Sequence, residues 1–258
     1  MPFIEPKLEI AKGNYTNHSH IYQIGINEAV STDWESFWSE GGIYPTSSIE
    51  VSTNLLHVSS SANEDTLEGV GARTITIEGL DANYNVVTET LNLQGKIAVS
   101  SSNNLIAINN AHVATGGPRQ QSGSLFLCLS GSSTNLLIGT IDNEYRRLMQ
   151  SHYTVPAGNK AYLQHVNCNV AVTSSAAEFA IFQRASGSIY RPSTINTTFG
   201  DAIVTNTNSS LTFDEKTEID LRIKSLGSAG IATGQFSLIL VSSSNIPVEP
   251  ARIEGFLL

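Results

Sequence analysis

Apolar and charged side chains alternate without interruption in Glu218-Ile219-Asp220-Leu221-Arg222-Ile223-Lys224. Successive side chains of a β-strand point to opposite faces, so this pattern predicts a strand that packs one face on a hydrophobic core. We expect the three apolar side chains to be buried, and the four charged side chains to face solvent or a partner.

Similar alternation occurs through most of the chain. Residues 73–78 and 87–93 alternate, and the loop between them, residues 79–85, is rich in Gly, Asp and Asn, which predicts a β-hairpin. Further strands are expected at residues 49–58, 105–113, 124–130, 153–155, 162–172 and 236–240. One face of the strand at 162–172 is expected to carry Tyr162, Val166, Cys168, Val170 and Val172.

The composition supports an all-β fold. Hydrophobic residues make up 40% of the 258 residues and charged residues 14%, whereas a disordered chain would be less apolar and more charged. Ser, Thr, Asn and Gly are abundant among the rest, as expected for short strands joined by many turns. The sequence therefore predicts an all-β protein with two β-sandwich or jelly-roll-like domains.

These patterns divide the chain into four parts. Residues 1–45 are expected to form an N-terminal arm with a short helix, and residues 46–142 a first β domain. Residues 143–245 are expected to form a second domain, a β-sandwich. Residues 246–258 contain two prolines and are expected to form an extended C-terminal tail.

The arm contains both tryptophans of the chain. Thr32-Asp33-Trp34-Glu35 has the spacing of a helix-capping box, and Gly41-Gly42 would end a helix that starts there. Such a helix would place Trp34, Phe37 and Trp38 on one face. This face either packs over the end of its own β domain or contacts a partner subunit, in which case the arm could be deleted without unfolding the protein.

The charge of the chain argues against two classes of partner. The net charge of −9 and the pI near 5.1 disfavour nucleic-acid binding, which depends on clustered Lys and Arg. No apolar run is long enough to span a bilayer. The first residues lack the basic and apolar regions of a secretion signal. We therefore expect neither nucleic acid nor a membrane as a partner.

Residues of the kinds used in catalysis do not form a recognisable motif. The chain lacks the Gly-x-Ser-x-Gly turn that presents a nucleophilic serine. His18 and His20 could share a metal only with a third ligand from elsewhere, and a solvated pair fits better. Glu64, Asp65 and Glu68 are most simply part of a solvated turn. We therefore expect no enzymatic activity, no catalytic residue and no cofactor.

One loop partly matches a calcium-binding loop. Asp81, Asn83 and Asn85 match its first three oxygen positions, but Val86 and Asn92 stand where Gly and Glu are required. Asp and Asn in a hairpin loop usually cap backbone amides. We therefore interpret the loop as a turn and expect no metal.

The two cysteines, Cys128 and Cys168, each lie within an apolar strand pattern. This position favours small buried apolar side chains, although a disulfide or a metal role remains an alternative. The cysteines are consistent with assembly in a reducing cytoplasm.

Several segments of the chain occur in a distinctive order. They are Ser59-Ser60-Ser61-Ala62-Asn63-Glu64-Asp65, Gly71-Ala72-Arg73-Thr74-Ile75-Thr76-Ile77-Glu78-Gly79-Leu80-Asp81-Ala82-Asn83-Tyr84-Asn85, Thr88-Glu89-Thr90-Leu91-Asn92-Leu93-Gln94-Gly95, Tyr153-Thr154-Val155-Pro156-Ala157-Gly158, Glu215-Lys216-Thr217-Glu218-Ile219 and Leu238-Ile239-Leu240-Val241. In this order they resemble a family of uncharacterised virion structural proteins of tailed bacteriophages, especially aquatic ones. The resemblance covers residues 30–241.

The resemblance implies a component of a virus particle, made in the cytoplasm of the host bacterium, and it implies no catalytic residues. We expect a subunit on the outside of the particle, as a head-decoration or protrusion protein. A tail or baseplate accessory protein is the nearest alternative. The expected partners are other virion proteins, either major capsid or tail proteins.

Contacts between copies of the chain are also expected. The apolar ends, Phe3-Ile4 and Phe256-Leu257-Leu258, predict contacts with partners or with other copies, and particle symmetry favours a homo-trimer. The alternative from another functional class is a receptor- or glycan-binding β-sandwich. It would need exposed aromatic rings, for which Tyr84, Tyr190 and Phe199 are the candidates.

Overall fold

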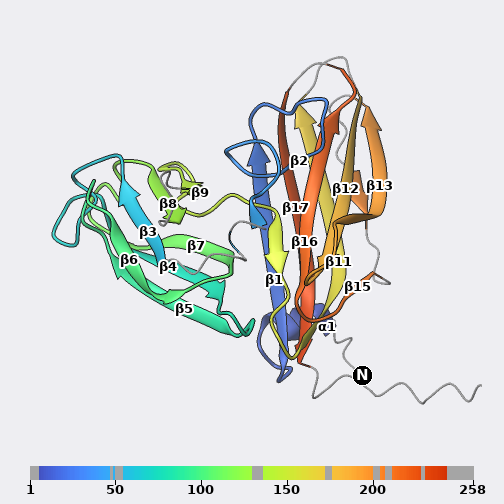
Figure 1. The fold of residues 1–258 in the computed structure, drawn as a ribbon, viewed down its shortest axis with the longest axis horizontal. Coiled ribbons are helices and arrows are strands. Elements are labelled where there is room, and N and C mark those ends of the chain that lie inside the picture. Colours follow the sequence, from blue (N-terminus) through green and yellow to red (C-terminus); the bar gives the residue numbers. More distant parts are fainter. Residues whose placement is uncertain are drawn as a thin grey trace, which may run out of the picture.

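The computed structural model describes residues 6–46, 49, 55–129, 136–171, 176–199, 204–206, 211–227 and 230–242. Antiparallel β-sheets make up nearly all regular structure in this part of the chain, and a short helix, α1 (Pro6–Ala11), lies near its start. The all-β prediction is therefore confirmed. The strands form two units, which lie beside each other in Figure 1.

The larger set of strands is termed the base unit. Its two sheets have the strand orders β1-β17-β11-β14, with β15 also on β11, and β10-β16-β12-β13, with β2 also on β16. The strands of the base unit are β1 (His18–Asn27), β2 (Glu35–Ser36), β10 (His152–Thr154), β11 (Asn159–Ala171), β12 (Ala176–Ala185), β13 (Arg191–Phe199), β14 (Val204–Asn206), β15 (Thr212–Phe213), β16 (Thr217–Ser225) and β17 (Ile231–Ser242).

Strands of the base unit pair in a nested order. β1 pairs with β17, the last strand, and β2 and β10 both pair with β16, the strand before it. β11 pairs with β14 and β15, and β12 pairs with β13. The base unit is therefore built like one long hairpin that is rolled up across two sheets.

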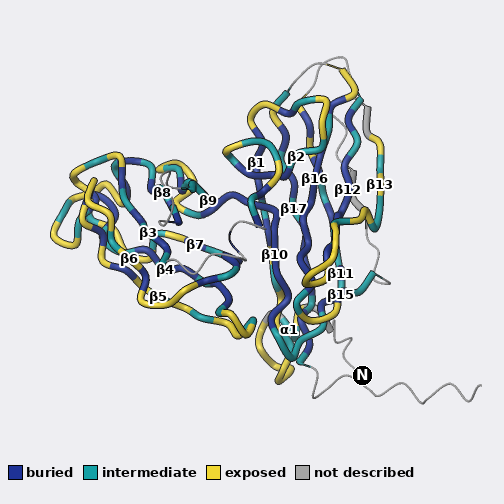
Figure 2. The backbone as a smooth tube through the Cα atoms, in the orientation of Figure 1, coloured by how far each residue is buried: buried dark blue, intermediate teal, exposed yellow. Residues whose placement is uncertain are grey.

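The two sheets of the base unit enclose one hydrophobic core. Ile219, Leu221 and Ile223 of β16 lie in it with Phe236 and Leu238 of β17. The prediction that the apolar face of residues 218–224 is buried is thus confirmed. Figure 2 shows β16 buried along nearly its whole length, because its opposite face is covered as well.

The face predicted for residues 162–172 is correct only in its second half. The three alternate positions from Val166 onward face the core, but Leu163 rather than Tyr162 takes the inward position before them. The register against β17 shifts between Leu163 and His165. A β-bulge of this kind adds one residue and reverses the face of what precedes it. Val172 lies outside the described residues.

A smaller set of strands, termed the inserted unit, has a separate hydrophobic core. Its sheets have the strand orders β6-β3-β8-β9 and β5-β4-β7, and the pairing of β4 with β5 confirms the predicted hairpin. The strands of the inserted unit are β3 (Leu55–Ser60), β4 (Ala72–Leu80), β5 (Val86–Asn92), β6 (Val99–Asn104), β7 (Ala107–Gly116), β8 (Leu125–Leu129) and β9 (Leu136–Ile141).

The inserted unit interrupts a single strand position of the base unit. β2 pairs with Arg222 and Ile223 of β16, and β10 pairs with residues 218–220 of the same strand. The chain leaves this edge after Phe37 and returns to it at Ser151, where the carbonyl oxygen accepts a hydrogen bond from β16. The two short strands therefore complete one edge of the sheet, with the inserted unit between them.

The segment predicted to be an arm belongs to the base unit, because residues 18–36 supply β1 and β2. The helix predicted after residue 32 was wrong, since Glu35–Ser36 is extended and pairs with β16. The extended backbone directs Phe37 into the base-unit core and Trp38 into the inserted-unit core. A helix would have placed both rings on one face and could not have filled both cores.

A close crossing of backbone segments marks the exit from the base unit. Gly25 of β1 lies opposite Gly234 of β17. Beside Gly25, the Phe37 carbonyl accepts a hydrogen bond of 2.9 Å from the Ser151 amide. A Cβ atom at Gly25 would lie 2.6 Å from the Ser151 nitrogen and closer still to the Phe37 oxygen. Only glycine leaves room for this crossing.

We expect G25A to lower the free energy of unfolding by about 1–3 kcal/mol, because two backbone segments would have to move apart to admit a methyl group. Urea unfolding measures the loss. Ser19 is exposed on the same strand, so S19A serves as the control and should change stability by less than about 0.5 kcal/mol. A G25A protein as stable as its parent would contradict the crossing.

Buried polar side chains also connect the two units. The Gln23 side chain donates a hydrogen bond of 2.9 Å to the Asn109 carbonyl. The Asn109 side chain donates to the Thr154 carbonyl (2.9 Å) and accepts from the Thr154 amide (2.8 Å). At another point of contact, the Ala157 amide donates to the Tyr84 carbonyl at 2.9 Å. The two units are therefore joined by specific contacts as well as by the chain.

Candidate functional site

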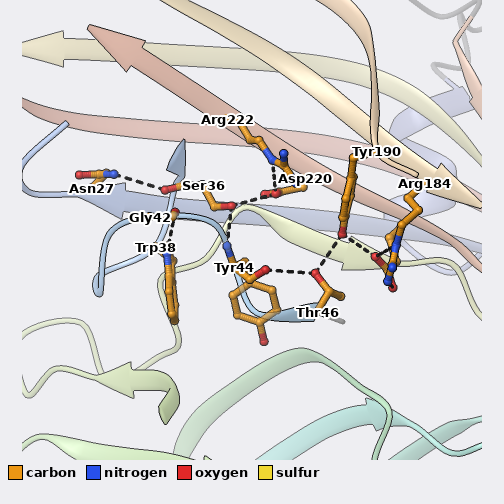
Figure 3. A network of polar contacts seen from close by, with 11 residues as sticks. Asn27, Ser36, Trp38, Gly42, Tyr44, Thr46, Arg184, Tyr190, Asp220 and Arg222 are labelled. Carbon is orange, nitrogen blue, oxygen red and sulfur yellow. Dashed lines mark hydrogen bonds and ion pairs between the residues drawn. The ribbon is translucent and has the colours of Figure 1, made fainter. Parts of the chain in front are cut away.

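The outward face of β16 carries a group of buried charged side chains. Glu218, Asp220 and Arg222 are 4%, 0% and 7% exposed, and Lys224 is half-buried. The prediction that these side chains face solvent or a partner was therefore wrong for three of the four. Residues 34–46, which lead into the inserted unit, help to cover them, and charges of opposite sign lie close together (Figure 3).

These side chains and the residues that contact them are termed the junction network. It consists of Ser36, Tyr44, Thr46, His152, Arg184, Tyr190, Glu218, Asp220 and Arg222.

Asp220 links the entering segment to the sheet. Its carboxylate accepts a hydrogen bond of 2.8 Å from the Ser36 hydroxyl and pairs with Arg222 Nε at 2.6 Å. The Ser36 hydroxyl accepts a hydrogen bond of 2.9 Å from the Tyr44 amide. Asp220 thus fixes, through Ser36, both ends of the turn between residues 36 and 44.

Glu218 forms the second ion pair of the network. Its two carboxylate oxygens lie 2.9 Å from Arg184 Nε and 2.6 Å from Arg184 Nη2, which is the forked geometry that strengthens such pairs. The Tyr190 hydroxyl donates to the same carboxylate and lies 2.9 Å from the Thr46 hydroxyl. Burial and the neighbouring carboxylates raise the pKa of Tyr190, so its hydroxyl keeps the proton that it donates.

Aromatic rings lie against the positive charges of Arg222 and Lys224. The guanidinium carbon of Arg222 lies 4.3 Å from the centre of the Tyr190 ring and 4.5 Å from that of Phe182. Trp34 packs edge-on against Phe182, with 5.2 Å between ring centres. The Lys224 ammonium lies 5.0 Å from the centre of a Trp34 ring. Cation–π attraction thus compensates in part for the water that these cations lose.

His152 lies beside the network, 1% exposed, and neither ring nitrogen has a hydrogen-bond partner among the described residues. Its ring stacks on Tyr44 with 4.7 Å between ring centres, and its backbone pairs with Asp220 across the sheet. Burial lowers the pKa of His152 to about 4, although the Asp220 charge acts in the opposite direction. The imidazole is therefore neutral at pH 7.

The chemistry of this arrangement is that of a structural clamp. Both buried carboxylates have an arginine partner, so neither is poised as a base toward a substrate. Among the described residues, no group of three or more His, Cys, Asp or Glu side chains could hold a metal ion. The network instead holds together the strand β16, the segment entering the inserted unit and the strand that returns from it.

The aromatic residues predicted to contact a partner are covered by this chain. Phe37 and Trp38 are 1% and 7% exposed, one in each hydrophobic core. Trp34 is half-buried and packs against Phe182 of β12. We therefore do not propose these three as a docking surface. Phe256-Leu257-Leu258 lies outside the described residues, and its contact role stays a prediction.

Sequence reasoning missed the uncharged polar residues that connect the two units. Ser36, Thr46 and Asn109 belong to the most frequent residue types of the chain, so nothing distinguishes them. Tyr190 was considered only as a candidate for glycan binding. One signal was available: Glu218, Asp220 and Arg222 share one strand face, where opposite charges two residues apart can pair with each other.

Two acidic residues outside the network bind backbone amides. Asp81 accepts hydrogen bonds from the amides of Asn83 (2.8 Å) and Asn85 (2.9 Å), which confirms the predicted turn. The hydrogen bond from Asn85 contributes most to lowering the pKa of Asp81. Asp65 was expected in a solvated turn, but it is fully buried and accepts hydrogen bonds from three backbone amides. That prediction was wrong.

Both cysteines are free thiols. Cys168 is buried in the base-unit core, as predicted, whereas Cys128 is only half-buried. Burial raises the pKa of both thiols, which disfavours the reactive thiolate.

Comparisons with known proteins add little to this picture. No family model matches the chain, and no curated protein matches it. Solved structures of infectious bursal disease virus are similar at a low level. The Gt strain structure is 12% identical over 90% of this chain and 74% of that chain, with a TM-score of 0.21. The T=1 particle structure is 13% identical over 89% and 71%, also with a TM-score of 0.21. TM-scores this low do not establish a common fold.

None of the helices in the described part of the chain combines the length and the apolar character that crossing a bilayer requires.

Proposed function

We propose that this protein is a non-enzymatic structural subunit of a bacteriophage virion, placed on the outside of the head as a decoration or protrusion protein. The nested strand order of the base unit is the observation that carries the proposal. Each of its two sheets has four strand positions. The first strand pairs with the last, and pairing continues inward from there, an order that supports a jelly roll. Jelly rolls are frequent among viral capsid proteins and lectins.

The inserted unit supports a position on the particle surface. It leaves the base unit at one strand edge and has its own hydrophobic core, so it extends beside the base unit as a second body (Figure 1). In such a subunit the base unit would contact the particle and the inserted unit would project from it. A tail or baseplate accessory protein could use the same arrangement and is the nearest alternative.

The proposed partners are the major capsid or tail proteins and further copies of the chain, most simply as a homo-trimer on a three-fold site. The proposed place of assembly is the cytoplasm of the host bacterium. The resemblance to virion structural proteins of tailed bacteriophages supports both points.

A receptor- or glycan-binding module is the second candidate, and one observation favours it. A pocket of ≈ 350 Å³ opens between β12, the start of β13 and the loop before β16. Its polar lining residues are Gln183, Ser188, Arg191, Thr212, Asp214 and Thr217. Hydroxyl, amide and charged groups of this kind can bind the hydroxyl groups of a sugar.

Binding of the purified full-length chain to particles that lack it tests the proposal. We expect saturable binding, and electron microscopy of labelled particles should place the protein at regular positions on the head. Removing Phe256, Leu257 and Leu258 should weaken binding, because each apolar side chain buried in a contact contributes about 2 kcal/mol. Label on the tail would support the accessory protein instead. Absence of the protein from purified particles would overturn the proposal.

The glycan alternative has its own test. Binding of a glycan to the full-length chain, reduced at least tenfold in R191A and D214A, would support a receptor-binding module at the pocket. The same affinity in both variants and the parent would exclude this pocket as the glycan site.

A further inference from the structure

We propose that the junction network is an acid-sensitive latch, in which protonation of His152 loosens residues 38–46 from the outward face of β16 while both hydrophobic cores stay folded. The latch would control how the inserted unit is held. It depends only on the junction and not on a role in a virion.

A new charge on His152 would act on both the segment that enters the inserted unit and the strand that returns from it. It is the first residue of β10, the strand by which the chain returns from the inserted unit. Its ring stacks on Tyr44, which lies in the segment that enters the inserted unit. Its backbone partner, Asp220, holds Ser36 of the same entering segment. Opening this contact would therefore loosen the turn between Ser36 and Tyr44 from the outward face of β16.

The charges that face His152 come from each element packed around it. Glu218, Asp220 and Arg222 lie on β16, and Arg184 lies on β12. Tyr44 and Tyr190 are the remaining titratable groups, and burial raises the pKa of both, so they are uncharged.

These charges balance before His152 is protonated. Two carboxylates face two guanidinium groups, and each carboxylate is committed to an arginine. Asp220 attracts an imidazolium, but Arg222 and Arg184 repel it, and burial outweighs all three. One oxygen of Asp220 accepts no hydrogen bond from the described residues, but its carboxylate charge is already paired with Arg222. A proton on His152 therefore leaves one positive charge in excess, in a site that excludes water.

The direction of the pH effect follows from the two states of the latch. His152 has a pKa of about 4 when the junction is closed, whereas an exposed imidazole has a pKa near 6.5. The open state therefore binds the proton more tightly, and closure weakens as the pH falls below about 6.5. The closed-to-open ratio should fall nearly tenfold per pH unit below about pH 6.5 and change little above it, which gives about 30-fold between pH 7.5 and pH 5.

The chain contains its own reporters of the opening. Trp34 and Trp38 are its two tryptophans, and both lie in the entering segment. Trp34 packs on Phe182 beside the network, so its fluorescence follows the junction, whereas Trp38 lies in the inserted-unit core. Far-ultraviolet circular dichroism follows the sheets of both units. Unfolding of the full-length chain in urea should be followed with both signals, at pH 7.5 and at pH 5.

We expect the two transitions to coincide at pH 7.5, and the fluorescence transition to move to lower urea than the dichroism transition at pH 5. In H152F the two transitions should coincide at both pH values. Phenylalanine keeps the stacking on Tyr44, and no hydrogen bond among the described residues is lost. H165F, which replaces a half-buried histidine on β11, is the control and should behave like the parent.

Two outcomes would overturn the latch. In one, H152F keeps the separation of transitions at pH 5; in the other, the parent shows none. If H152F does not fold, nuclear magnetic resonance of the histidine-labelled parent decides. A folded protein whose His152 imidazole stays neutral down to about pH 5 supports the latch, and titration near pH 6.5 in the closed protein contradicts it.

Discussion

Replacing Leu221 with aspartate is expected to abolish folding. Leu221 is fully buried at the centre of β16, with Ile219 and Ile223 beside it in the same core. L221D removes the packing of a buried leucine and places a carboxylate where no cation can reach it, so the combined loss exceeds about 5 kcal/mol. Such a loss is comparable to the whole stability of many domains. Circular dichroism and soluble yield measure the outcome.

Ile231 provides the matched control for L221D. It lies on β17, in the other sheet of the base unit, and is 52% exposed. I231D makes a similar chemical change but leaves the carboxylate in water, so it should cost at most about 1 kcal/mol. A folded L221D protein with the spectrum of its parent would contradict the packing of the inward face of β16 against the other sheet of the base unit.

The burial of the inward face of β16 was predictable from the sequence of that strand alone. Strict alternation fixes which side chains share a face, and the apolar set has no better place than a core. The outward face was not predictable, because its cover comes from residues 34–46, far away in the sequence. A row of charges on a strand looks the same whether water or another segment covers it.

The same limit explains the errors at the N-terminal end. Trp34, Phe37 and Trp38 have the spacing of a helix face, and local spacing was the only signal available. Pairing of Glu35–Ser36 with β16 and the two separate cores decided the conformation instead. The insertion of one unit into a strand of another depends on such distant pairing, and the pattern of strands along the chain does not encode it.

Removing the carboxylate of Glu218 should be nearly as damaging as L221D. E218L would leave the buried Arg184 without its carboxylate partner and would remove the acceptor of the Tyr190 hydroxyl. Breaking a buried ion pair in this way typically costs about 3–5 kcal/mol. E218Q keeps the shape and one acceptor oxygen, so it should lose less. Urea unfolding at pH 7.5 measures both variants.

A double variant distinguishes the cost of burying the two charges of the Arg184–Glu218 pair from the attraction between them. R184M/E218L replaces both charges with apolar side chains of similar size, so no unpaired charge remains in the buried site. The double variant should be more stable than E218L alone, because replacing a buried ion pair as a whole is often neutral. R184M completes the double-mutant cycle. The loss in the double variant should be smaller than the sum of the two single losses by a coupling free energy of about 1–3 kcal/mol. If the two losses simply add, Arg184 and Glu218 act independently and the clamp does not depend on their pairing.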